Sequence, residues 1–549
     1  MNAADTGGIA ERAGGESPST RSKTAPPNEA ESRTRWSVAP VVAMAAFMEV
    51  LDIAIANVSL EHIAGGMAAS QDEATWILTS YLITNAIVLP ISGWLSTVIG
   101  RKRFYMSCIA GFGVSSLLCG LAPNLFWLIV FRCIQGLTGG GLQPNSQAIL
   151  ADSFPPRQRG MAFAFYGMAV VFAPAIGPTL GGWITDNYTW RWIFLINVPV
   201  SVVLFFLINA MISDPPHLEA ERARLLRNGL RLDYFGFGLL ALGLGMLQFV
   251  LDRGQEDDWF GSHVITICAV VAALGIVGFV VWELRRRDPI VDLKLLKNKN
   301  FALANALMFM LGFILLGSTA FIPLFTQTLL GYTALSAGLV LTAGGFAIMA
   351  VMPIIGRLVN AVDSRWLIAF GLAVSAYGLY RMSHFTLEVD YWTIATDRMI
   401  QAVGLGFLFI PINTLAYVGL PPEKNNNASA LINLARNLGG SVGIALLTTL
   451  LARRTQYHWN MLVENISASN ETYRSAAGHL QEHMLRHGGD AAQALHKAQA
   501  VLEQQLHQQA LLLSYDDCFR VLVVIFISLI PFVFLMRRPN VIGQEKAMS

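Results

Sequence analysis

Three charged side chains occur inside apolar stretches in the first quarter of the 549-residue chain. Glu49 and Asp52 stand three positions apart in FMEVLDIAIANVSL, a spacing that puts both carboxylates on one face of a helix. Arg132 begins RCIQGLTGGGLQP, which contains no other charge. A charge at the centre of a bilayer costs about 2.5–3.5 kcal/mol on insertion scales, so such residues are candidates for function. Carboxylates near a buried arginine favour proton binding and release.

The depths of these residues can be compared by counting from the expected helix ends. Asp52 precedes Leu60 by eight residues, which places it roughly 12 Å below one membrane surface. Arg132 follows Phe126 by six residues, roughly 9 Å below the same surface. The two charges could therefore meet, either in a proton pathway or as a fixed structural ion pair. Glu49 lies deeper, near the midplane, and is the second candidate for the proton carrier.

A third apolar stretch, VVFAPAIGPTLGG, contains two prolines and three glycines. Pro174 and Pro178 lie four apart on one helix face, where each removes a backbone donor. Gly177 and Gly181 have the small-xxx-small spacing that lets another helix approach closely. Ordinary tight packing would explain the glycines equally well. In combination with the buried arginine, the pattern favours a helix pair that moves during transport.

The second half of the chain has its own charges in apolar stretches. Asp397 and Arg398 precede MIQAVGLG, and Arg436 lies in NLARNLGGSVG. They either line a cavity or neutralise one another, because buried charges need partners. The sequence does not choose between these two arrangements.

The composition is that of an all-α, polytopic membrane protein. Hydrophobic residues make up 54% of the chain, charged residues make up 13%, and the mean hydropathy is +0.50. Lys and Arg concentrate in alternate loops, which predicts that both termini are cytoplasmic. About fourteen stretches are long enough to cross a bilayer. They lie near 38–60, 76–96, 104–122, 126–149, 161–183, 192–212, 233–251, 263–283, 301–325, 336–356, 366–383, 394–418, 429–451 and 518–536.

Several classes of protein are disfavoured by the motifs. No GxxxxGK[ST] occurs, which argues against an ATP-driven pump and leaves an ion gradient as the energy source. No nucleophile–base set stands out, so we expect no enzyme and no catalytic residue. The five cysteines lie in apolar spans without CxxC spacing, and we expect no disulfide, metal or cofactor. Nucleic acid is not an expected partner.

The chain also repeats itself. RCIQGLTGG at Arg132 matches RMIQAVGLG at Arg398, and FPP at 154–156 matches LPP at 420–422, both at an offset of 266. Parallel halves with a substrate site between them are typical of transporters. The expected organisation is a disordered cytoplasmic tail (1–37), a six-helix half (38–212), a linker with two inserted helices (213–300), a second six-helix half (301–536) and a cytoplasmic tail (537–549).

Two segments are expected outside the membrane. Residues 213–231 predict a basic amphipathic stretch on the cytoplasmic surface. Residues 452–515 predict a long outer loop with helical periodicity, whose apolar stripe needs a partner. That partner is the protein's own surface, a second subunit or a periplasmic adaptor. Three histidines spaced by four in this loop favour a solvated helix face over a metal site. They are His479, His483 and His487.

Several motifs resemble those of a known family. LDIAIANVSL, GWLSTVIGRKR, RCIQG and AIGPTLGG look like the motifs of fourteen-span drug:proton antiporters of the major facilitator superfamily. Further stretches, WRWIFLINVP and QTLLGYTALSAG among them, resemble the EmrB-type multidrug efflux pumps of that family. The resemblance runs from about residue 36 to the C-terminus.

The resemblance implies roles for individual residues. Asp52 and Arg132 would couple transport to protons. The expected antiporter motif is Gly167, Pro174, Gly177, Pro178, Gly181 and Gly182, and the expected cytoplasmic loop motif is Gly93, Gly100, Arg101 and Lys102. The family usually has an acidic residue where this chain has Thr97, which argues against a charge-based latch at that point.

The sequence therefore predicts an inner-membrane antiporter that exchanges protons for hydrophobic or amphipathic drugs and toxic compounds. The resemblance adds a periplasmic membrane-fusion adaptor and an outer-membrane channel as partners. The alternative is a proton-coupled transporter of a specific metabolite, for uptake or export, on the same fold. A non-transporting sensor would leave the buried carboxylates and the internal repeat unexplained.

Overall fold

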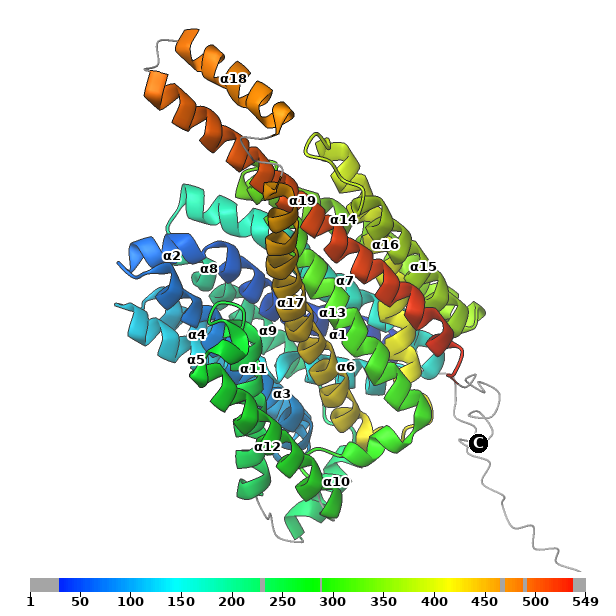
Figure 1. Cartoon of the computed structure of the whole chain (residues 1–549). Helices are drawn as coiled ribbons and strands as arrows, with labels where there is room; N and C mark the ends of the chain where they lie inside the picture. Colours follow the sequence, from blue (N-terminus) through cyan, green and yellow to red (C-terminus); the bar gives the residue numbers. More distant parts are fainter. Residues whose placement is uncertain (1–28, 228–232, 287–288, 465–469, 487–490, 537–549) are drawn as a thin grey trace, which may run out of the picture.

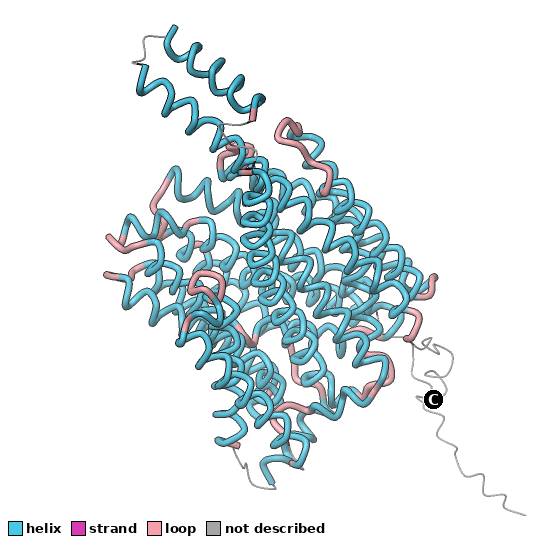
Figure 2. The backbone as a smooth tube through the Cα atoms, viewed as in Figure 1, coloured by secondary structure: helices cyan, strands magenta, loops and turns pink. Residues whose placement is uncertain are grey.

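The computed structural model describes residues 29–227, 233–286, 289–464, 470–486 and 491–536. Over these residues the chain consists of helices joined by short loops, with no strand (Figure 2). A helix satisfies its own backbone hydrogen bonds, which a segment in hydrocarbon requires. The N-half contains α1 (Glu29–Val58), α2 (Leu60–Gly66), α3 (Gln71–Ile99), α4 (Arg101–Gly120), α5 (Leu125–Gly139), α6 (Leu142–Ser153), α7 (Pro156–Asn187), α8 (Trp192–Leu195) and α9 (Asn197–Met211).

A middle segment and the C-half complete the bundle. The middle segment contains α10 (Pro216–Arg227), α11 (Tyr234–Arg253), η1 (Trp259–Gly261), α12 (His263–Arg285) and η2 (Leu293–Lys297). The C-half contains α13 (Lys299–Thr328), α14 (Ala334–Ala361), α15 (Ser364–Met382), α16 (Tyr391–Ala416), η3 (Pro422–Lys424), α17 (Asn425–Val463), α18 (Glu471–Arg486) and α19 (Ala491–Val533).

The number of membrane spans differs from the expected fourteen. Among the described residues, eleven helical segments are long and apolar enough to cross a bilayer, so a multi-pass membrane protein is clear but fourteen crossings are not confirmed. Three further helices, α4, α15 and α19, pack within the same bundle. Glycine, serine and tyrosine dilute the apolar content of α4 and α15, and the first half of α19 is polar.

Two contacts join the halves along the bundle. Helix α7 packs against α1 on one side and against α14 on the other, while α17 packs against α13, α3 and α6. Helix α11 lies beside α3, and α12 packs on α11 at the periphery (Figure 1). Helices α7 and α17 thus contact both halves, and α7 lies next to α1, which carries Glu49 and Asp52.

The span predicted at 126–149 is confirmed as one membrane-spanning segment, Leu125–Ser153. Within it the helical hydrogen bonding is interrupted between α5 and α6, at Gly140 and Gly141, whose backbone stays in the right-handed helical region. A Cβ on Gly140 would lie 2.9 Å from the carbonyl oxygen of Asn85 on α3. Glycine therefore lets α3 approach the junction of α5 and α6, and a run of three glycines also weakens helix continuity.

The region predicted as an outer loop at 452–515 is largely helical. Helix α17 continues to Val463, and α19 already begins at Ala491, far ahead of the span expected at 518–536. Helix α18 packs on the first half of α19, and together they project from the bundle (Figure 1). This end is called the α18 end below, and the opposite one the Arg101 end.

Two other segments differ from their predicted bounds. Helix α1 begins at Glu29, inside the tail predicted at 1–37, whose first 28 residues lie outside the described part. The amphipathic stretch expected at 213–231 contains α10, which packs against α3 and η3. Residues 228–232, the tail at 537–549 and His487 also lie outside the described residues.

Candidate functional site

Asp52 and Arg132 meet in the N-half. Arg132 Nη1 lies 2.5 Å from Asp52 Oδ2, and both side chains are 0% exposed. Arg132 Nε donates to the carbonyl oxygen of Ile77 (3.1 Å), and the guanidinium lies 4.4 Å from the ring centroid of Tyr81. Breaking a buried pair by removing one partner leaves an uncompensated charge and is strongly destabilising. The similar depths of the two residues in the sequence thus correspond to direct contact.

Neutral donors complete the environment of Asp52. Gln135 Nε2 donates to Asp52 Oδ1 (3.0 Å), and so does Asn197 Nδ2 (2.7 Å). Gln135 also accepts from Arg132 (2.7 Å) and donates to Ser116 Oγ (2.7 Å). The carboxylate is therefore tied to α5 and α9 by three donors. Sequence reasoning missed Gln135 and Asn197, although both lie in motifs that carried the family resemblance.

Glu49 occupies a separate polar site. Its side chain is buried and accepts from Asn85 Nδ2 (3.1 Å), whereas Oε2 has no hydrogen-bond partner among the described residues. It makes no ion pair with Arg132. Arg436 of the C-half reaches towards the same region and donates to Gln143 of α6. Glu49 thus faces a cation from the opposite half of the protein.

The C-half charges do not neutralise one another. Asp397 pairs with Arg381 on α15 (Nε to Oδ1, 2.9 Å), a partner that the sequence did not indicate. Arg398 instead donates to Gln401 Oε1 (2.7 Å) and Ser318 Oγ (3.1 Å). With Arg436 contacting the N-half, the three predicted charges have three separate environments.

The proline-glycine motif lies on α7, which stays helical through Pro174 and Pro178. Gly177 and Gly181 pack against α1: a Cβ on Gly177 would overlap Ala54, and one on Gly181 would lie 3.2 Å from Ile55 Cγ2. These positions keep α7 close to the helix that carries both carboxylates. The other two glycines of the motif differ. Gly167 faces the C-half through Phe409, and Gly182 faces no atom within 4 Å.

Replacing Gly181 by leucine is expected to reduce transport by at least about tenfold, because the larger side chain would force α7 away from Ile55. The matched control is Gly182→Leu, since a Cβ at that neighbouring position meets open space. Transport rates of both purified variants in liposomes provide the measurement. Equal rates for Gly181→Leu and Gly182→Leu would show that the contact with α1 does not matter.

At the Arg101 end, the side-chain amide of Asn426 on α17 joins the two halves. Arg101 pairs with Asp152 of α6 (2.5 Å), and its Nε donates to Oδ1 of Asn426 on α17 (2.9 Å). Asn426 Nδ2 in turn donates to Thr97 Oγ1 (3.3 Å). Gly93 allows this approach, because a Cβ there would lie 2.7 Å from the Asn426 carbonyl oxygen. Thr97 and Arg101 of the N-half are thus joined to α17 of the C-half by hydrogen bonds to one side-chain amide.

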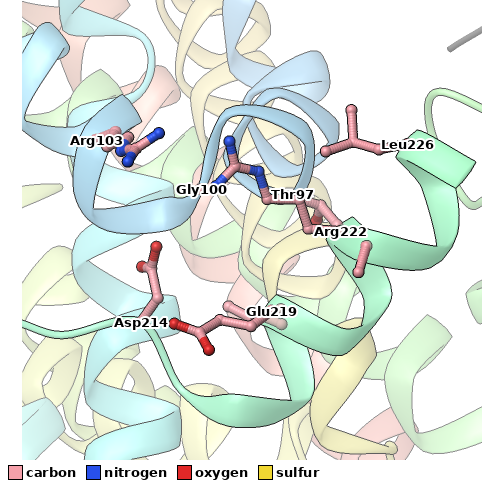
Figure 3. Close-up of a pocket in the computed structure, with 9 residues that line it drawn as sticks. Thr97, Gly100, Arg103, Asp214, Glu219, Arg222 and Leu226 are labelled. Atoms are coloured by element: carbon pink, nitrogen blue, oxygen red, sulfur yellow. The ribbon is translucent and has the colours of Figure 1, made fainter.

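The remaining loop-motif residues contact α9 and the segment that follows it. The backbone N–H of Lys102 donates to Asp214 (2.8 Å), and Lys102 Nζ donates to the carbonyl oxygen of Asn209 (2.6 Å). Gly100 has a φ of +100°, which a side chain would strain. Figure 3 shows Gly100 and Asp214 lining a pocket of about 340 Å³ with Arg222 of α10. The motif thus shapes the turn into α4.

Substituting alanine for Asn426 is expected to open the Arg101 end, because it removes two of the side-chain hydrogen bonds that join the halves there. Spin labels on the exposed residues Gln158 and Val362 would report longer distances in the variant. Asn427→Ala is the matched control, since Asn427 Oδ1 has no hydrogen-bond partner among the described residues. An unchanged distance distribution in Asn426→Ala would contradict a latch at this residue.

Comparisons with known proteins identify the family to which this chain belongs. The sequence pattern of the Major Facilitator Superfamily matches residues 42–444. The chain belongs to this superfamily. It is 36% identical over 499 residues to "Fatty acid resistance protein FarB" of Neisseria gonorrhoeae, covering 90% of this chain and 95% of that protein. It is 35% identical over 500 residues to "Multidrug export protein EmrB" of Escherichia coli, covering 91% and 94%.

A solved structure shows the same fold. The proton:xylose symporter XylE has a TM-score of 0.57 with this chain at 14% identity, covering 91% of this chain and 97% of the symporter. The EmrB-type resemblance inferred from the motifs is therefore confirmed by full-length relatives. Membership of the superfamily also points to a transporter rather than an enzyme.

Proposed function

We propose that this major facilitator protein exchanges protons for hydrophobic and amphipathic compounds and so exports them. The observation that carries the proposal is the fully buried Asp52–Arg132 pair with its neutral donors. The names of the relatives, a multidrug export protein and a fatty acid resistance protein, supply the direction and the class of cargo.

Protonation of Asp52 would change the packing of three helices. As a carboxylate, Asp52 accepts from Arg132, Gln135 and Asn197. A protonated carboxyl has lost its negative charge and has a donor of its own, so its bond with the Arg132 guanidinium is weakened most. Arg132 belongs to α5, and the contact of α1 with that helix loosens. Proton binding is thereby linked to helix movement.

Glu49 is suited to relay the proton between the halves. Its partnerless oxygen can take a proton without displacing a donor, and Arg436 of the C-half is the nearby cation. Neutralising Glu49 would weaken its attraction to Arg436 and favour separation of the halves. One proton entering is worth about 2.3 kcal/mol per 100 mV. That energy supports roughly a fifty-fold gradient of substrate in a 1:1 exchange.

Orientation follows from the positively charged loops. The Arg101 end carries the cluster of Arg101, Lys102 and Arg103, which favours the cytoplasmic side. The α18 end would then face the periplasm, and the protein would lie in an inner membrane with both termini in the cytoplasm.

The α18 end offers a surface for a periplasmic adaptor. The apolar stripe predicted on α19 consists of Leu495, Val501, Leu502, Leu506 and Leu513. Leu495 (39%) and Leu513 (38%) are exposed and the other three are partly buried, while Met461 at the end of α17 is 55% exposed. Exposed apolar side chains on a projecting segment support a partner site. We therefore assign α18 and the first half of α19 to docking of an adaptor that leads to an outer-membrane channel.

Reconstitution in liposomes with an imposed pH gradient tests the proposal. Cationic dyes and amphipathic antibiotics should move in the direction opposite to the proton flux, and dissipating the gradient should stop them. Movement in the same direction as the protons would identify an uptake symporter. Transport at the same rate with and without the pH gradient would show that it is not coupled to protons.

A further inference from the structure

The C-half repeats most of the polar site of the N-half, but without its acid. In the N-half, two of the three donors to the Asp52 carboxylate come from one helix, α5: Arg132 through Nη1 and Gln135 through Nε2. The arginine also donates to the oxygen of the glutamine three residues later (2.7 Å). The repeated motif thus consists of an arginine, a glutamine and a carboxylate on the opposing helix.

The C-half has the same arginine–glutamine pair. Arg398 Nη1 donates to Gln401 Oε1 at 2.7 Å, the distance found in the N-half. On the opposing helix α13, Arg398 donates to Ser318 Oγ (3.1 Å) and Thr319 Oγ1 (3.2 Å). Both acceptors are neutral, and among the described residues Arg398 makes no ion pair.

Ser318 stands at the position that corresponds to the acid. It follows Asp52 by 266 residues, the offset that relates the two arginine motifs. Serine is shorter than aspartate and carries no charge. The positive charge that the N-half pairs with its own carboxylate therefore has, at the corresponding position of the C-half, only a neutral hydroxyl as its partner.

Two buried donors at this position lack acceptors. Arg398 Nε and Gln401 Nε2 have no hydrogen-bond partner among the residues that the structure describes. Arg398 is 3% exposed and Gln401 is 0% exposed, so water does not replace a partner at the surface. The nearest carboxylate in sequence, Asp397, is paired with Arg381. A desolvated cation with unpaired donors is unfavourable unless an anion binds it.

The surroundings suit an anion with an apolar tail. The stretch LLGSTAFIPLF at 315–325 is apolar apart from Ser318 and Thr319, and Thr319 is only half-buried. Gly344 lets the Arg398 side chain pack closely against α14, since a Cβ at that position would lie 2.9 Å from Arg398 Cγ. A guanidinium binds carboxylates in a planar, two-point geometry.

We propose that Arg398 and Gln401, at the position where Ser318 stands in place of the acid, bind the carboxylate of an anionic amphipathic substrate. This site deepens the proposed export function and rests on it for the fate of the bound compound. The N-half motif retains its own carboxylate and responds to protons, whereas the C-half motif receives its carboxylate from the cargo.

The site is tested by replacing Ser318 with aspartate, so that the protein's own carboxylate pairs with Arg398. Purified full-length protein in detergent would be titrated with dodecanoate, with acetate and with dodecyltrimethylammonium. Wild-type protein should bind dodecanoate, and Ser318→Asp should weaken that binding at least about tenfold because its carboxylate occupies Arg398. Ser318→Ala, which introduces no carboxylate and leaves the positive charge of Arg398 in place, should bind dodecanoate within about threefold of the wild type. The cation should bind all three proteins alike.

Other readouts keep the result interpretable. Ser318→Asp should melt at a higher temperature than the wild type without ligand, which shows that it is folded and that the arginine is paired. Undiminished dodecanoate binding in this variant, or acetate binding as tight as dodecanoate, would overturn the proposal. Absence of dodecanoate binding to the wild type would do the same. These titrations need no gradient, so a failure of proton-driven export in liposomes would leave their outcome unaffected.

Discussion

Replacing Asp52 by asparagine is expected to abolish gradient-driven efflux, with a loss of at least about a hundredfold. The amide fills the same space but cannot take up a proton, and its nitrogen would face either the donor Arg132 or the donors Gln135 and Asn197. Efflux from liposomes with and without an imposed pH gradient provides the measurement. Substrate binding in detergent should persist, because Asp52 is enclosed by α5 and α9 and faces no substrate path in this proposal.

The matched control is Asp397→Asn. Asp397 is also a buried aspartate next to an arginine, but its partner Arg381 is 40% exposed and can turn towards solvent. We expect that variant to keep most of its gradient-driven efflux. If Asp52→Asn transports at the wild-type rate, proton coupling does not depend on Asp52, and Glu49→Gln becomes the decisive variant.

Replacing residues 460–510 by a short Gly/Ser linker is expected to separate transport from resistance. The deletion removes α18 and most of the polar part of α19, but it retains the contacts of Arg454 and His458 with Asp517 (2.5 and 2.8 Å). Transport in liposomes should therefore continue, because the bundle is intact. Resistance of whole cells to exported drugs should fall to that of cells without the protein, because no adaptor can dock.

The control for this experiment keeps the segment and removes only its exposed apolar groups. A variant with Met461→Gln and Leu495→Gln should fold with α18 in place and still lower resistance, since both side chains are exposed. Loss of liposome transport in the linker variant would make the segment part of the transporter's own fold. Full resistance in whole cells would show that no partner docks there.

The class of fold and one central contact could be predicted from the sequence because both depend on local patterns. Long apolar stretches determine a membrane bundle, since backbone groups in hydrocarbon must bond within the helix. The Asp52–Arg132 contact could be predicted from the depth of each residue below the membrane surface, because a helix rises by a fixed amount per residue. The structure brings these two residues together without either helix departing from that count.

Other features depend on how helices turn against one another, which periodicity does not determine. Gln135 and Asn197 are neutral, so nothing in their sequence marks them as partners of Asp52. Arg381 was not connected with Asp397 because a salt bridge between helices requires the rotation of both. The Asn426 latch was missed for the same reason, since its contacts come from the packing of α17 on α3.

Helix α17 is long enough to connect movements at the two ends of the bundle. It runs unbroken for 39 residues, from Asn425 beside the latch to Val463, a length of roughly 58 Å. No proline interrupts it, and Asp517 clamps its far part to α19 through Arg454 and His458. A tilt that frees Asn426 at one end must therefore swing the other end in the opposite sense. A protein docked on α18 would be pushed and pulled once per transport cycle, and so would sense which side of the membrane is open.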